Sequence, residues 1–61
     1  MLTYKIQQKV GENYITLKDH QGYDMEAITL SNAWYIIYLF RMREQTAVEC
    51  RIVTSKGEYI Y

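Results

Sequence analysis

The residues best suited to metal binding or acid-base chemistry are a histidine and three carboxylates that lie close together in the sequence. His20 follows Asp19 directly, and Asp24 and Glu26 come shortly after it. A histidine surrounded by carboxylates is able to bind a metal ion or to act as a tuned general base. The same stretch also has the composition of an ordinary polar turn that ends at Gly22. We therefore expect no metal site and no cofactor in this protein.

The one cysteine of the chain is the next candidate for chemistry. Cys50 lies between Val48 and Ile52 in a segment where polar and apolar residues alternate. The alternation places Cys50 on the apolar side of a strand, where a free cysteine behaves as a small hydrophobic residue. The sequence also contains no phosphate-binding glycine loop, dinucleotide fingerprint or catalytic serine motif. We expect a protein that is not an enzyme and has no small-molecule substrate.

A further group of residues has the chemistry of a nucleic-acid site. Cations and aromatic rings alternate along segments that are predicted to share one face of a sheet, with Glu49 as the acidic residue among them. Such faces bind single-stranded nucleic acid, because rings stack on bases while cations hold phosphates. Solvent-facing strands are also ordinarily rich in lysine and tyrosine, so the pattern has a purely structural explanation too. The residues of this candidate site are Lys5, Lys9, Tyr14, Lys18, Arg51, Tyr59 and Tyr61.

These residues must be positioned by strands, and the clearest strand pair is predicted around Gly57. The run Thr54-Ser55-Lys56-Gly57 is typical of a type I turn followed by a left-handed glycine. The predicted hairpin pairs residues 48–54 with residues 58–61, so that Val53 lies opposite Tyr59. Opposed residues share a face, which puts the basic and aromatic residues on one side and most aliphatic residues on the other.

A second hairpin is predicted near the N-terminus. Apolar and polar residues alternate over 2–7 and again over 14–18, and the chain turns at Gly11-Glu12-Asn13. Another turn is expected at 19–22, followed by a third strand within 23–29. Met25-Glu26-Ala27 would also suit a helix, so a helical segment is the alternative at this position.

Residues 31–45 are compatible with a strand or a helix. The apolar run 34–40 has a high strand propensity by composition, and strands throughout would form a small all-β barrel. A helix is favoured because Ser31 is a good N-cap, Leu30 and Tyr35 occupy the positions of a hydrophobic staple, and no alternation is present. The predicted fold is α+β, a small antiparallel sheet in the order β-β-(β)-α-β-β with one helix packed on it.

The predicted helix is apolar on two sides. Ala33, Ile36, Ile37 and Phe40 share one face at helical spacing and would cover the sheet. A second stripe lies well round from the first, and one sheet covers only one side of a helix. Either loops cover this stripe, or another protein does, as a second copy or as a target. In the latter case the interface residues are Trp34, Tyr35, Tyr38 and Met42, of types enriched in protein interfaces.

Length and composition limit the architecture. A chain of 61 residues predicts a single small domain, 1–61, with a marginal core. Seven basic residues balance seven acidic ones, so net charge favours neither nucleic acid nor a membrane partner. We expect no signal peptide and no membrane span, and the single cysteine favours the reducing cytoplasm. The predicted core is Leu2, Ile6, Leu17, Ile36, Ile37, Phe40, Val48, Ile52 and Ile60.

Together these features predict a small protein-binding module of the interaction or inhibitor type. We expect it to form a homodimer, to bind a protein target, or both. The alternative is a single-stranded nucleic-acid-binding protein that uses the basic and aromatic sheet face. By size alone the chain is comparable to small accessory proteins, including those of phages and mobile elements. No motif is specific enough to assign a family.

Overall fold

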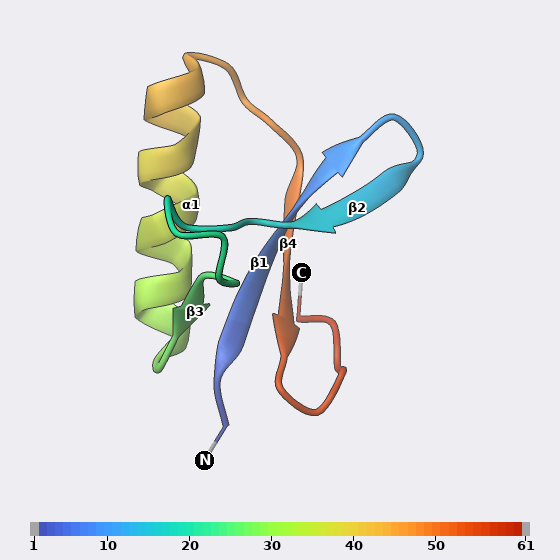
Figure 1. The fold of residues 1–61 in the computed structure, drawn as a ribbon, viewed down its shortest axis with the longest axis vertical. Coiled ribbons are helices and arrows are strands. Elements are labelled where there is room, and N and C mark those ends of the chain that lie inside the picture. Colours follow the sequence, from blue (N-terminus) through green and yellow to red (C-terminus); the bar gives the residue numbers. More distant parts are fainter. Residues whose placement is uncertain (1, 61) are drawn as a thin grey trace.

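The computed structural model describes residues 2–60, which form one helix packed on a four-stranded antiparallel sheet (Figure 1). This arrangement confirms the predicted α+β class and is not a closed barrel. The elements follow one another as β1 (Tyr4–Val10), β2 (Asn13–Thr16), β3 (Glu26–Ala27), α1 (Leu30–Glu44) and β4 (Cys50–Thr54).

β1 is the central strand and pairs with each of the other three. Its residues 7–10 pair with β2, Tyr4 and Lys5 pair with β3, and residues 4–8 pair with β4. Successive strand residues point to opposite faces. Ile6 therefore enters the core, whereas Lys5, Gln7 and Lys9 belong to the opposite side, which we call the outer sheet face.

The core lies between the inner side of the sheet and α1. Its buried hydrophobic side chains are Ile6, Leu17, Ala27, Ala33, Ile37, Cys50 and Ile52. Four predicted core residues are among them, namely Ile6, Leu17, Ile37 and Ile52. Three more, Ile36, Phe40 and Val48, are partly buried against this cluster. The predicted phase of the helix is therefore confirmed.

Two residues predicted to be buried are exposed: Leu2 has 40% and Ile60 43% of its surface open. Leu2 precedes the first residue of β1. The Ile60 amide donates to the Ile52 carbonyl at 2.9 Å, so Ile60 lies next to β4 at the edge of the sheet. The helix α1 packs on β1 and β3, and it leaves this edge uncovered. Alternation along a strand predicts which way a residue points. It does not predict whether another element covers that point.

The N-cap of α1 is Thr29, not the predicted Ser31. The Thr29 hydroxyl accepts a hydrogen bond from the Asn32 amide at 3.1 Å. Threonine and serine both suit this position, and the earlier start makes Leu30 the first helical residue, where it packs against the core. The predicted staple between Leu30 and Tyr35 is therefore wrong. At the other end, Gln45 is left-handed with φ 57° and its amide donates to the Met42 carbonyl.

The turn around Gly57 has the predicted register, with Val53 opposite Tyr59. The predicted strand pair is shorter than expected, because β4 begins at Cys50 rather than at Val48 and the segment after Gly57 forms an isolated bridge rather than a strand within the described residues. Gly57 adopts φ +86°, a conformation that glycine tolerates well. The Thr54 hydroxyl accepts hydrogen bonds from the backbone amides of Lys56 and Glu58, so these two amide groups of the turn have an acceptor within it.

The hairpin between β1 and β2 is tighter than predicted. Val10 pairs with Asn13, so the connection has only Gly11 and Glu12, and Asn13 belongs to the strand rather than to the turn. The predicted third strand exists as β3, but it is short because only Glu26 and Ala27 pair with β1.

Candidate interaction surfaces

One side of α1 carries large apolar residues that are exposed, so within residues 2–60 loops do not fully cover the second stripe of the helix. Ala33 and Ile37 are buried against the sheet. Successive helical residues turn by about 100°, so the residues that follow each of them point away from the sheet. The exposed fractions on that side are 39% for Trp34, 59% for Tyr35, 58% for Tyr38 and 58% for Met42. We call these four residues the helix face.

The outer sheet face is organised around Arg51. The guanidinium carbon of Arg51 lies 3.8 Å from the centre of the Tyr14 ring and 4.1 Å from that of Tyr59. Its Nε donates to the Gln7 side-chain oxygen at 2.7 Å, and the Gln7 amide nitrogen donates to the Thr16 hydroxyl at 3.1 Å. The arginine is thus held between two aromatic rings and above the central strand.

The lysines of this face are engaged in ion pairs. Asp24 pairs with Lys18 and, at 3.0 Å, with Lys5. Hydrogen bonds from Lys18 and then from Lys5 hold the pKa of the Asp24 carboxyl below its usual value, and the hydrogen bond to Asp24 raises the pKa of Lys5. Lys9 pairs with Glu49 at 3.3 Å, and the Tyr14 hydroxyl donates to the same carboxylate at 3.2 Å.

The structure therefore places the candidate nucleic-acid residues within 2–60 on or beside the outer sheet face. There their side chains already form ion pairs, hydrogen bonds or ring contacts with other residues of the same chain. Sequence reasoning identified Glu49 as the opposing charge and missed Asp24. Asp24 lies 19 positions from Lys5 in the chain, and only the fold brings the two together. Tyr61, the remaining candidate, lies outside the described residues.

The histidine segment is a turn that is built by its neighbouring carboxylate. Asp19 accepts hydrogen bonds from the amides of Gln21 and Tyr23 at 2.8 and 3.0 Å, while His20 is exposed. Over residues 2–60, no three histidine, cysteine, aspartate or glutamate side chains form a group able to hold a metal ion.

Cys50 is buried, and burial raises the pKa of its thiol, although the nearby Arg41 acts in the opposite direction. A raised pKa leaves little thiolate near neutral pH. Arg41 also donates from its Nε to the Val48 carbonyl at 3.0 Å, which ties the end of α1 to the segment before β4.

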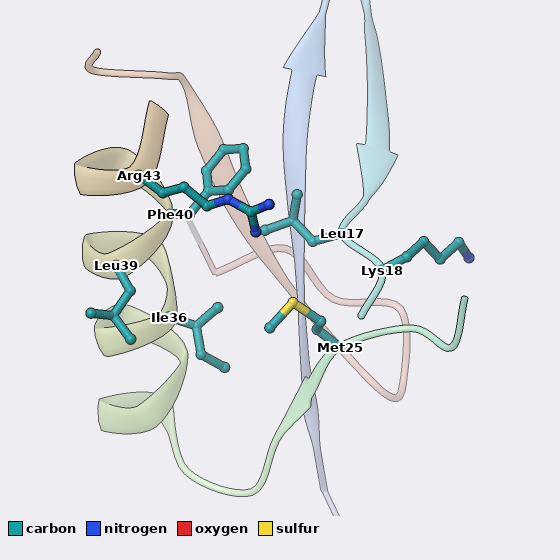
Figure 2. Close-up of a pocket in the computed structure, with 7 residues that line it drawn as sticks. All are labelled: Leu17, Lys18, Met25, Ile36, Leu39, Phe40 and Arg43. Carbon is teal, nitrogen blue, oxygen red and sulfur yellow. The ribbon is translucent and has the colours of Figure 1, made fainter. Parts of the chain in front are cut away.

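A pocket of about 220 Å³ lies between α1 and the segment that joins β2 to β3 (Figure 2). This pocket was not predicted from the sequence, because its walls come from parts of the chain that are far apart in sequence. The lining residues are Leu17, Lys18, Met25, Ile36, Leu39, Phe40 and Arg43. None of them belongs to the helix face.

No family model, no curated protein and no solved structure matches this chain. Among residues 2–60, no helix combines the length and apolar character required to cross a membrane, and α1 has 15 residues.

Proposed function

We propose that this chain is a non-catalytic protein-binding module that associates with a second copy of itself through the helix face. The observation that carries the proposal is the exposure of four large residues on one side of a single helix, with Tyr35, Tyr38 and Met42 each more than half exposed. No charged residue occurs between Leu30 and Phe40 to keep this side hydrated. Contiguous exposed apolar surfaces of this kind mark protein interfaces.

The spacing of the helix face suits docking against its own copy. Trp34, Tyr38 and Met42 lie four positions apart, which places them one above another on an α-helix. If two helices dock antiparallel with the two-fold axis at Tyr38, Trp34 of one copy lies against Met42 of the other. Sulfur and aromatic rings attract each other at such contacts, and a two-fold arrangement buries the same surface on both copies.

The packing of the helix supports the same proposal. Within residues 2–60, α1 packs on β1 and β3, and its second apolar side stays exposed. Burying a large apolar side chain contributes about 1.5–3 kcal/mol, so association would stabilise a fold with a small core. The buried single thiol is also in keeping with the reducing cytoplasm as the compartment.

Light scattering across a dilution series tests the proposal with Tyr38→Glu and a matched control, Tyr23→Glu. Both tyrosines are exposed, but Tyr23 lies outside α1. The wild type and Tyr23→Glu should approach twice the 7.3 kDa chain mass on concentration, and Tyr38→Glu should remain at 7.3 kDa. A wild type that stays monomeric up to about 1 mM, or equal association of both variants, would remove self-association through this face.

Binding of single-stranded nucleic acid is the second candidate, because two aromatic rings and four cations share the outer sheet face or its border. The internal pairs of these cations would have to open first, so we rank this function below protein binding. Titration of labelled single-stranded DNA and RNA tests it, and the affinity should fall steeply with added salt. Non-specific binders reach about 10⁻⁴–10⁻⁶ M at physiological salt, so no binding at about 100 μM protein eliminates this candidate.

A further inference from the structure

The pocket beside α1 has an apolar interior and a charged opening. The apolar side chains of Leu17, Met25, Ile36 and Phe40 approach one another from the two walls, and Leu39 lies at the helical edge with 45% of its surface exposed (Figure 2). Leu17 is buried and the other three of the four are partly buried, so the interior belongs to the edge of the core.

The volume of the pocket favours a side chain over a small molecule. Sites for small molecules usually have about 300–1,000 Å³, and this pocket has about 220 Å³. Interfaces between proteins commonly rest on a few large side chains, each inserted into a small desolvated pocket. One leucine, phenylalanine or tryptophan side chain is an occupant of the appropriate size.

The charge at the opening favours an acidic neighbour for that side chain. The guanidinium of Arg43 extends from α1 across the pocket toward Leu17 (Figure 2), and it has no ion pair or hydrogen bond with any residue among 2–60. Lys18 directs its ammonium group away from the helix and pairs it with Asp24. No acidic residue lines the pocket. Arg43 is therefore the group at the opening that is available to a carboxylate.

We infer that this pocket is a docking site for a segment of another protein, into which the segment inserts one large apolar side chain while an adjacent aspartate or glutamate pairs with Arg43. The site is separate from the helix face and does not require self-association. None of the four residues of the helix face lines the pocket, so the two sites use different side chains of the chain.

Capped dipeptides provide the probes for this site. The first is acetyl-Phe-Glu-amide, and two controls are acetyl-Phe-Gln-amide, which lacks the charge, and acetyl-Ala-Glu-amide, which lacks the anchor. Amide chemical shifts of the ¹⁵N-labelled protein report binding. With the first probe, shifts should saturate at millimolar concentrations and concentrate at residues 17, 18, 25 and 36–43. The glutamine probe should bind about threefold more weakly, the size expected for an exposed ion pair, and the alanine probe should give no saturable shift.

Two variants test the role of the charge. Arg43→Gln should make the glutamate and glutamine probes bind equally, and the control Lys56→Gln, at an exposed cation in the turn after β4, should preserve the threefold difference. The inference is wrong if the first probe gives no saturable shifts up to about 20 mM, a range that covers weak fragments. It is also wrong if the shifts occur elsewhere, or if Arg43→Gln retains the preference for glutamate.

The failure of this inference is distinguishable from the failure of the proposed function. Tyr38→Glu should abolish self-association and leave the binding of the first probe unchanged, because Tyr38 does not line the pocket. A protein that dimerises but binds no probe refutes the pocket alone. A protein that binds the probe but never dimerises refutes the helix-face proposal alone.

Discussion

Arg51 connects three segments of the outer sheet face. Its guanidinium group stacks between Tyr14 of β2 and Tyr59 after β4, and its Nε hydrogen-bonds to Gln7 of β1. A cation over an aromatic ring contributes about 0.5–1 kcal/mol at an exposed site. A planar guanidinium is able to stack on two rings at once and to donate in its plane, which an ammonium group does not do.

Replacement of Arg51 by lysine should therefore destabilise the fold although the charge is kept. We expect Arg51→Lys to lower the free energy of unfolding by about 1 kcal/mol, measured by urea denaturation. The matched control is Arg43→Lys, because the side chain of Arg43 has no ion pair or hydrogen bond with any residue among 2–60. Equal stability of the two variants would show that the stacking contributes nothing.

Asp24 gives the fold an acid-sensitive contact. Hydrogen bonds from Lys18 and Lys5 hold the pKa of Asp24 below its ordinary value of 3.8. A carboxyl whose pKa is lower in the folded state stabilises the fold above its unfolded pKa, and this contribution is lost as the pH falls through the folded pKa. Because the three side chains are partly exposed, salt should weaken the effect.

We expect Asp24→Asn to show a smaller loss of stability than the wild type as the pH falls from about 5 to about 2. The measurement is the urea midpoint at each pH, in low salt and in high salt. The double variant Lys5→Gln/Lys18→Gln should flatten the profile in the same way, because it removes the two donors. If Asp24→Asn keeps the full acid sensitivity of the wild type, Asp24 is not its source.

At the scale of the elements, the phase of α1 decides which residues are core and which are surface. Ile37 has 1% of its surface exposed, while its neighbour Tyr38 points to solvent. We expect Ile37→Ala to cost about 2–5 kcal/mol of unfolding free energy, as is usual for a truncation in a packed core. Phe40→Ala should cost less than the 3–5 kcal/mol typical of a fully buried phenylalanine, since Phe40 is only partly buried.

Tyr38→Ala is the control at the adjacent position and should leave the stability of the dilute monomer nearly unchanged. Thermal or urea unfolding at low micromolar protein concentration checks all three variants. A larger loss for Tyr38→Ala than for Ile37→Ala would reverse the assigned helix phase.

Local sequence features predicted the helix and the order of the four strands, whereas the last predicted strand, after Gly57, is only an isolated bridge at Tyr59. The Gly57 turn was predictable because a left-handed glycine after Thr54-Ser55-Lys56 restricts the local backbone to few alternatives. The helix was predictable from its lack of alternation, but its start was not, because Thr29 and Ser31 are both competent N-caps and the choice depends on where Leu30 packs. The bounds of β3 within 23–29 could not be predicted, because the strand has only two residues and such a short segment shows no clear alternation.

At the scale of the whole molecule, prediction from sequence was limited by contacts between distant segments. The second apolar stripe of α1 could be predicted, since its residues belong to one element, but whether loops cover that stripe could not. The pocket and the Asp24 pairs could not, because they arise only when the segment between β2 and β3 packs near α1 and β1. The burial of Leu2 and Ile60 was wrongly predicted for the same reason, since coverage by a second element is not encoded in strand alternation.

The single tryptophan allows the two proposed surfaces to be separated in one measurement. Trp34 lies in the helix face, has 39% of its surface exposed, and does not line the pocket. Self-association would remove this ring from water, so the emission maximum of the wild type should shift to longer wavelength on dilution and follow the same midpoint as the molecular mass. The emission of Tyr38→Glu should keep its long-wavelength position at every concentration. Addition of acetyl-Phe-Glu-amide should leave the emission of both proteins in place, because Trp34 does not line the pocket. A shift of the Tyr38→Glu emission on adding the probe would show that the two surfaces are coupled. If the emission maximum of the wild type does not change on dilution, Trp34 is not at the contact between copies.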